Sequence, residues 1–112
     1  LAAPPVGKYF KPEFAGQALG AIGDSAVVDI CGYGGQALQH APVLCDEWAA
    51  ALPADALTRR ERIVDLDSGS VDLRRVRSSA TAPLIHLAIL HRDGGATPIG
   101  RGFYEPPVTL FQ

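Results

Sequence analysis

The stretch from residue 23 to residue 38 constrains the fold most strongly, because it joins an apolar run to closely spaced glycines. Residues 26–31 are rich in β-branched and apolar side chains, which predicts a mostly buried strand. Gly32, Gly34 and Gly35 follow and permit backbone angles that a Cβ atom would resist. A helix that begins after such a loop directs free N–H groups toward an anion. A tight packing corner between strand and helix would use the same glycines without any ligand.

The composition is that of one globular domain. The chain has 112 residues, of which 47% are hydrophobic and 20% are charged, so it can bury a core and is not disordered. Its formal net charge of −2 gives no general attraction to nucleic acid or to anionic lipid, and we expect neither as a partner. Basic residues cluster at 59–62 and 74–77, and clusters this short are typical of solvated helix faces.

The chain shows no pattern of a signal peptide or of a membrane span. The longest apolar run, residues 82–90, is far shorter than the roughly 20 residues that a membrane helix needs. Cys31 and Cys45 lack metal-ligand spacing, and we expect buried free thiols in a reducing compartment. The chain contains no methionine and begins at Leu1, which leads us to expect a piece of a longer protein.

Helical and extended patterns alternate along the rest of the chain. Trp48 lies in a segment of helical spacing and is interpreted as a core anchor. The predicted elements are a brief strand within residues 8–12, short helices at 36–40 and 43–52, a helical turn within 54–62, a strand at 63–67, a helix at 71–78 with Val71, Leu73 and Val76 facing inward, and a strand at 84–90.

The last third of the chain carries the second strong signal. Residues 84–90 form a nearly continuous apolar strand, and His86 within it is interpreted as a hydrogen-bonded core histidine. His91 and Arg92 follow, and then a glycine-rich loop at residues 94–102. Arginine in such a loop pairs readily with carboxylate or phosphate. We therefore predict that this loop and the loop at Gly32–Gly35 share an anion site; a hairpin loop with surface charges is the alternative.

Several short motifs occur together in an order that is similar to a known family. They are Gly-Asp-Ser-Ala at 23–26, Gly-x-Gly-Gly at 32–35, Val-Asp-Leu-Arg-Arg-Val at 71–76, Ala-Pro-Leu-Ile at 82–85 and Ile-Gly-x-Gly at 99–102, followed by Pro107 and Phe111. In this order the chain resembles, over residues 3–112, the carboxyl-terminal part of the YahG/YlbE-like family. That family includes the AllG-type large subunit of oxamate carbamoyltransferase.

The resemblance implies an α+β fold in a cytoplasmic bacterial protein. We expect residues 1–112 to form a single small domain with a mixed sheet flanked by short helices. The family's reaction interconverts oxalurate and phosphate with oxamate and carbamoyl phosphate, so the implied ligand is a small anion of that class. The implied partners are the rest of a longer chain or partner subunits, in an oligomer.

Candidate ligand-binding residues combine the motif positions with the charged groups of the last loop. They are Asp24, Ser25, Gly32, Gly34, Gly35, His91, Arg92, Gly95, Gly100, Arg101 and Gly102. The three histidines lack metal-ligand spacing, and we predict neither a metal nor a cofactor. No catalytic residue is assigned.

The chain also departs from the family pattern. Thr97-Pro98 and Arg101 stand where Gly-Gln and a small residue are usual, and residues 45–67 match poorly. Two hypotheses follow. The chain is either a carbamoyltransferase-like domain that is inactive alone and contributes a glycine-rich site for carbamoyl phosphate, or a non-catalytic assembly domain of a divergent family member.

Overall fold

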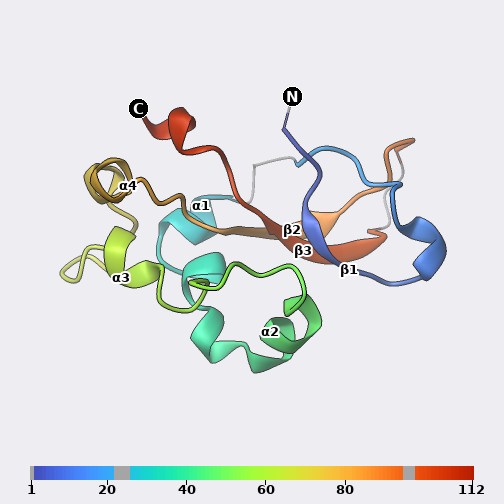
Figure 1. Cartoon of the computed structure of the whole chain (residues 1–112), viewed down its shortest axis with the longest axis horizontal. Coiled ribbons are helices and arrows are strands. Elements are labelled where there is room, and N and C mark those ends of the chain that lie inside the picture. Colours follow the sequence, from blue (N-terminus) through green and yellow to red (C-terminus); the bar gives the residue numbers. More distant parts are fainter. Residues whose placement is uncertain (1, 22–25, 95–97) are drawn as a thin grey trace.

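A three-stranded antiparallel sheet forms the centre of the computed structural model, which describes residues 2–21, 26–94 and 98–112 (Figure 1). Short helices surround the sheet. In chain order the elements are β1 (Val6–Tyr9), η1 (Pro12–Phe14), α1 (Ala26–Ile30), η3 (Gly34–Gln36), η4 (Leu38–His40), α2 (Pro42–Trp48), α3 (Arg60–Ile63), α4 (Leu73–Ser79), β2 (Ile85–Ile89), β3 (Gly100–Tyr104) and η5 (Val108–Phe111). The predicted α+β class is confirmed.

The central strand of the sheet is β3, which pairs with β1 on one side and with β2 on the other. Both pairings are antiparallel, with Phe103 opposite both Val6 and His86. The expected mixed sheet is therefore wrong for the described residues. The strand predicted at residues 26–31 is absent from this sheet, and β2 and β3 follow each other as the arms of a hairpin.

The predicted strand at residues 26–31 is instead the helix α1. Its β-branched residues favour a strand only where they pack on a sheet face, and here Val27 and Val28 are exposed. The helical turn directs Asp29 into the interior, where its side chain is completely buried. Ile30 packs against a second apolar cluster, described below.

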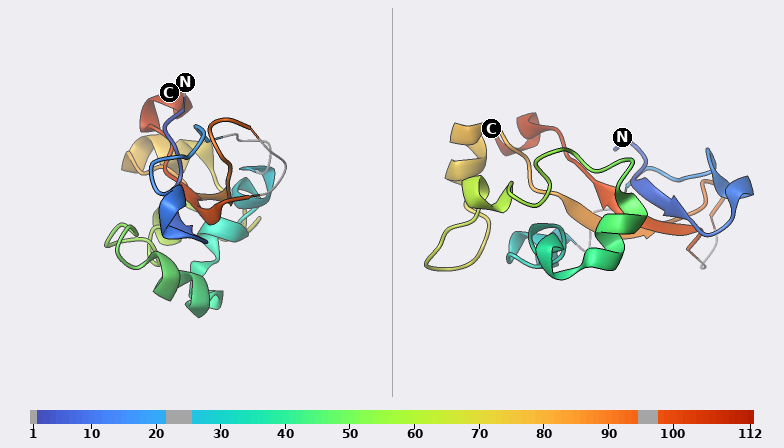
Figure 2. Two further views of the ribbon diagram at one scale, coloured as in Figure 1. Left: turned by 90° about the vertical axis from the view of Figure 1, so that its right-hand side faces the viewer. Right: turned by 60° about the horizontal axis from the view of Figure 1, so that its bottom comes forward.

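Helix α2 lies against one face of the sheet and builds the main core there (Figures 1 and 2). Trp48 is 2% exposed, and its ring lies 5.5 Å from that of Phe103. Its indole Nε1 donates to the Arg101 carbonyl oxygen at 3.1 Å, which satisfies the polar end of the ring. The prediction of Trp48 as a core anchor is confirmed. The helix is shorter than predicted, and Pro42 begins it at a position where no N–H donor is needed.

A second, smaller core lies at one end of the elongated molecule, where α3 and α4 pack together (Figures 1 and 2). It contains Ile63, Val64, Val71 and Val76. The strand predicted at residues 63–67 is reduced to a single bridge between Val64 and Val71. The helix predicted at residues 71–78 is confirmed as α4 and begins after Asp72, whose Oδ1 accepts from the Arg74 N–H at 2.8 Å. Leu73, expected inside, is 44% exposed.

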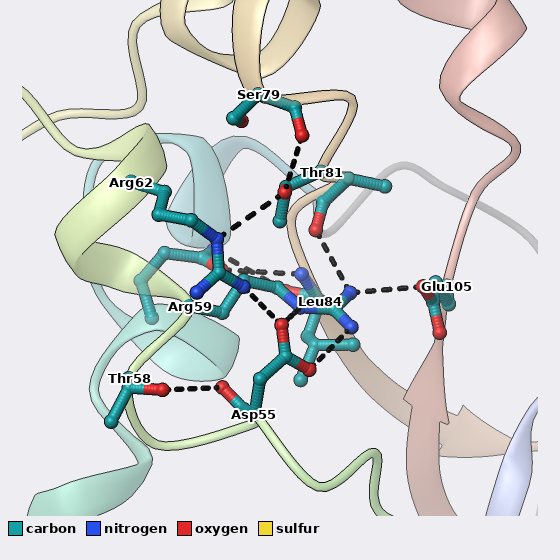
Figure 3. A network of polar contacts seen from close by, with 10 residues as sticks. Asp55, Thr58, Arg59, Arg62, Ser79, Thr81, Leu84 and Glu105 are labelled. Atoms are coloured by element: carbon teal, nitrogen blue, oxygen red, sulfur yellow. Dashed lines mark hydrogen bonds and ion pairs between the residues drawn. The ribbon is translucent and has the colours of Figure 1, made fainter.

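A network of charged side chains links α3 to the sheet (Figure 3). The Arg59 side chain is 8% exposed and donates to the Ala82 carbonyl, to Glu105 and to Asp55, at 2.9–3.3 Å. Arg62 also pairs with Asp55. The hydrogen bond from Arg59 holds the pKa of Asp55 below its usual range, against the opposing effect of burial. Arg59 therefore links its own segment, which includes Asp55, to Ala82 and to Glu105, which are distant from it in sequence.

Both cysteines are free, as predicted. The sequence predicts burial for both, but Cys31, which directly follows α1, is exposed. The Cys45 thiol is half-buried and donates to the Leu38 carbonyl. Within the described residues, no helix has the length and apolar character to cross a membrane.

Candidate functional site

A buried aspartate and a half-exposed histidine form the most distinctive polar contact of the structure. Asp29 lies on α1 and His86 lies on β2, and the Asp29 Oδ1 atom is 3.0 Å from the His86 ring Nδ1. The same oxygen accepts from the backbone N–H of His86 at 3.1 Å and from that of Gly35 at 2.7 Å. His86 is thus hydrogen-bonded as predicted, but 40% of its side chain is exposed, so it belongs to the border of the core.

Gly34 and Gly35 are required by the close approach of this loop to β2. Gly34 has a φ of +53°, and a Cβ atom there would lie 2.4 Å from both Asp29 Oδ1 and His86 Nδ1. A Cβ atom on Gly35 would lie 1.9 Å from the Leu84 carbonyl oxygen. The glycine loop therefore closes over the Asp29–His86 contact. The Gly35 N–H, expected to bind an anion, binds the chain's own carboxylate.

The side chain of Gln36 completes the contact between this loop and β2. Its amide Nε2 donates to the Leu84 carbonyl at 3.3 Å and to the Asp29 carbonyl at 2.8 Å, and its Oε1 accepts from the Leu84 N–H at 3.2 Å. Together with Asp29, Gln36 thus satisfies backbone groups on the edge of β2 that faces away from β3. This fixes the position of His86 relative to α1.

A shallow pocket of about 290 Å³ opens beside His86, between β2, β3 and α2. This volume lies near the lower end of the range for small-molecule sites. Its lining is mainly apolar, with one imidazole and one guanidinium: Leu44, Trp48, His86, Leu87, Ala88, Arg101 and Gly102.

The two titratable residues of the pocket, Arg101 and His86, each contact a carboxylate, Glu47 and Asp29 respectively. Arg101 forms a two-point ion pair with Glu47, in which Nε lies 2.7 Å from Oε2, and this hydrogen bond holds the pKa of Glu47 below its usual range. The hydrogen bond that His86 donates to Asp29 raises the pKa of His86 above its usual value, although burial opposes the rise. His86 therefore takes up a positive charge more readily than an ordinary histidine. The pocket can present a cationic donor to a small anion.

The structure places the predicted site residues in two groups. Gly34 and Gly35 support His86, and Arg101 and Gly102 line the pocket. The predicted residues Asp24, Ser25 and Gly95 lie outside the described residues.

The remaining predicted residues lie away from the pocket lining. Gly32 follows α1 and passes close to the Gly69 carbonyl, and Gly100 is a buried position at the start of β3. His91 and Arg92 follow the far end of β2, where the His91 Nδ1 accepts from the Asp93 N–H at 3.1 Å. Of the second predicted loop, Arg101 and Gly102 therefore reach the pocket beside His86, whereas His91 and Arg92 lie at the other end of the strand.

Two residues of this site were not among the predicted ligand-binding residues. The sequence pattern places Asp29 within an apolar run and predicts His86 to be a core residue. One signal was available: Asp29 is the single charged residue of the run at 26–31, and such a residue is rarely buried without a partner. The partner itself lies 57 residues away in sequence, beyond the reach of local patterns.

The described ranges contain no group of three or more His, Cys, Asp or Glu residues that could hold a metal ion.

The fold and the pocket define a small α+β domain with an antiparallel sheet that carries an aspartate–histidine pair at its edge. No protein-family model matches the chain.

Two Escherichia coli (strain K12) proteins match nearly the whole chain. The uncharacterised protein YahG is 31% identical over 96% of the chain, and the oxamate carbamoyltransferase subunit AllG is 30% identical over the same share. The chain is thus a homologue of a segment of YahG and AllG, which confirms the resemblance to the YahG/YlbE-like family. It spans 26% of the length of YahG and 30% of that of AllG.

A solved structure supports the fold. A conserved protein of unknown function from Enterococcus faecalis V583 aligns with a TM-score of 0.68 and 25% identity. The alignment covers 98% of this chain and 30% of the other chain.

Proposed function

We propose that this chain is the segment of an oxamate carbamoyltransferase-like protein that supplies a small-anion pocket at His86. The observation that carries the proposal is the position of the Asp29–His86 pair beside a pocket that Arg101 also lines. The small anions that we propose as ligands of this pocket are oxamate, carbamoyl phosphate and phosphate. The similarity to AllG supports this choice among small anions.

In this proposal the glycine loop does not bind the anion itself but favours the protonated form of His86. Gly35 binds Asp29, and Asp29 raises the pKa of His86, so the loop favours the cationic imidazole that an anion would contact. Arg101, which also lines the pocket, is held by its ion pair with Glu47. The remaining chain of a longer protein, or a partner subunit, would complete the site.

A titration of the whole 112-residue chain followed by NMR tests the proposal. Addition of oxamate or carbamoyl phosphate at pH 6 is expected to shift the amide signals of His86, Ala88, Arg101 and Gly102 first. Replacement of His86 by Gln removes the cationic donor, and a charge-assisted hydrogen bond is worth about 1.5–3 kcal/mol, so binding should weaken about tenfold or more. His91→Gln, which changes a histidine outside the pocket, serves as the matched control. Shifts centred on His91 and Arg92, or no saturable shift, would contradict the proposal.

The second hypothesis, an assembly domain, is favoured by the apolar surface of α1. Val27 is 70% exposed and Val28 is 47% exposed, and Tyr33 nearby is 66% exposed. Apolar side chains gathered in this way mark protein contacts more often than isolated ones do. We propose self-association through this surface, tested by sedimentation velocity. Val27→Lys should lower the average mass, whereas a wild-type chain that stays monomeric at all concentrations contradicts self-association through this surface.

A further inference from the structure

The hydrogen bonds around Asp29 decide where the proton of His86 lies. Three nitrogen atoms lie within hydrogen-bond distance of Asp29 Oδ1: the backbone nitrogens of Gly35 and His86, which donate to it, and the His86 ring Nδ1. A carboxylate oxygen only accepts hydrogen bonds, so Nδ1 must carry a hydrogen. A neutral imidazole has one ring proton, and the other nitrogen then bears a lone pair. The neutral ring of His86 therefore has its lone pair on Nε2.

The ring geometry directs this lone pair away from Asp29. Asp29 is fully buried, whereas 40% of the His86 side chain is exposed and lines the pocket. Because the two ring nitrogens point in different directions, the edge that faces buried Asp29 holds Nδ1, and Nε2 belongs to the other side of the ring. Gly34 closes the Nδ1 edge, since a Cβ atom there would lie 2.9 Å from Cε1.

We propose that His86 exchanges a proton through Nε2 with a molecule bound in the pocket, and that Asp29 is the positioning residue that fixes the tautomer required. The inference rests on the proposed function in so far as the pocket must bind a small molecule. In the forward step an N–H or O–H bond of that molecule breaks, its electron pair remains on the molecule, and its proton bonds to Nε2. The imidazolium so formed keeps its Nδ1–H on Asp29, and the reverse step returns the proton. A nitrogen that accepts a carbamoyl group must lose a proton, so such a step suits carbamoyl transfer.

The charges around His86 favour the imidazolium that this step forms. Asp29 from α1 contacts the ring directly. Arg101 from β3 shares the pocket with His86, and its charge is balanced by Glu47 from α2, which also lies 4.0 Å from Lys8 of β1. Asp29 thus stabilises the imidazolium, as a general acid–base histidine requires.

The alternative is a purely structural role, in which Asp29 only accepts hydrogen bonds from backbone N–H groups beside β2. It makes no demand on the tautomer of His86, because an Asp29 that accepted the two backbone N–H groups would suffice. Both roles are compatible with an Nδ1–H on Asp29, so the reactivity of Nε2 toward a molecule bound in the pocket separates them.

The test is a ¹⁵N NMR measurement of the histidine side chains in the whole chain. Above the pKa of His86, we expect Nδ1 to carry the proton and Nε2 to show the shift of an unprotonated nitrogen. Asp29→Asn should lower the pKa of His86, because the hydrogen bond to a carboxylate and its opposite charge are lost. His91→Gln should leave both properties unchanged. A neutral ring protonated at Nε2, or an Asp29→Asn variant with an unaltered His86 pKa, overturns the inference.

A second measurement needs no variant and separates the inference from the proposed function. Diethyl pyrocarbonate acylates an unprotonated, accessible histidine nitrogen, and mass spectrometry can compare His86 with His40 and His91. We expect His86 to be modified at Nε2 and oxamate to slow only that modification. Modification of His86 unaffected by bound oxamate overturns the proton exchange while anion binding survives. Absence of oxamate binding, with the Nδ1–H tautomer present, overturns the proposed function and the proton exchange with it.

Discussion

At the scale of single residues, Gly34 connects the backbone of the glycine loop to the chemistry of His86. Its φ of +53° lies in the left-handed region, and its missing Cβ leaves room for Asp29 Oδ1 and His86 Nδ1. Both the conformation and the space thus require glycine. The Gly-x-Gly-Gly pattern predicts a loop that needs glycine. It does not predict that this loop approaches Asp29 and His86.

Replacement of Gly34 by Ala should therefore be strongly destabilising. We expect a loss of about 3 kcal/mol in the free energy of unfolding, from left-handed strain plus a broken charge-assisted contact. Gly69→Ala is the matched control, because Gly69 has a φ of +74° but no neighbouring atom within 4 Å of the place that a Cβ atom would take, so only the strain of about 1 kcal/mol remains. Urea unfolding of both variants measures the difference. Equal losses would contradict the close approach at Gly34.

Ala80 presents the opposite case, a residue with a Cβ in a glycine conformation. It follows α4 with a φ of +50°, and the Thr81 N–H donates to the Val76 carbonyl, as at many helix ends that use glycine. Ala80→Gly should raise the free energy of unfolding by about 0.5–1 kcal/mol, because left-handed strain exceeds the entropy cost of glycine. Ser78→Gly, inside the same helix, should lower it instead. A destabilised Ala80→Gly variant in urea unfolding would contradict this explanation.

At the scale of elements, the edge of β2 explains why α1 is helical. Asp29 and Gln36 satisfy backbone groups of His86 and Leu84 that a neighbouring strand would otherwise bind. A strand at residues 26–31 would present alternate side chains to opposite faces, whereas the helix buries Asp29 and partly buries the adjacent Ile30. Local β-propensity indicated the wrong element because the decisive partners lie 48 and 57 residues away.

The elements that the sequence predicted well have local signals. Helix α4 carries its own N-cap at Asp72, β2 lies in a nearly continuous apolar run, and Trp48 marks the core face of α2. The strand predicted at residues 63–67 failed because its alternating pattern reflects packing of Ile63 and Val64 against α4. The pocket was not predictable in this way, since Arg101 and Trp48 meet only after the sheet and α2 have packed.

The Arg59 network gives a prediction about how α3 is fastened to the sheet. Arg59→Met removes donors to the Ala82 carbonyl, Asp55 and Glu105, so it should lower the free energy of unfolding by about 2–3 kcal/mol. Arg74→Met, whose side chain is 89% exposed in the wild type, should change it by less than about 0.5 kcal/mol. Thermal or urea unfolding compares the two. An Arg59→Met variant as stable as Arg74→Met would show that the network contributes nothing.

At the scale of the whole molecule, the Asp29–His86 pair makes stability depend on pH. The hydrogen bond to Asp29 raises the pKa of His86 above its usual value, so the folded state binds this proton more tightly than the unfolded state. The stabilisation is complete below about pH 6.5 and is lost as the pH rises through the raised pKa.

Unfolding in urea across pH 6–9 measures this dependence. The free energy of unfolding should fall more steeply with rising pH in the wild type than in His86→Gln, which has no group to titrate at this position. His91→Gln should retain the wild-type slope. Identical slopes in the wild type and His86→Gln would show that the pair is not coupled to folding.

Binding of a small anion at His86 is the property on which the proposed function depends, and a crystal structure of the chain grown with oxamate would reveal it directly. We predict oxamate in the pocket beside Trp48, with an oxygen within hydrogen-bond distance of the His86 Nε2 and the Asp29 Oδ1 contact to Nδ1 retained. Oxamate bound only at His91 and Arg92, or an empty pocket at saturating oxamate, would contradict it.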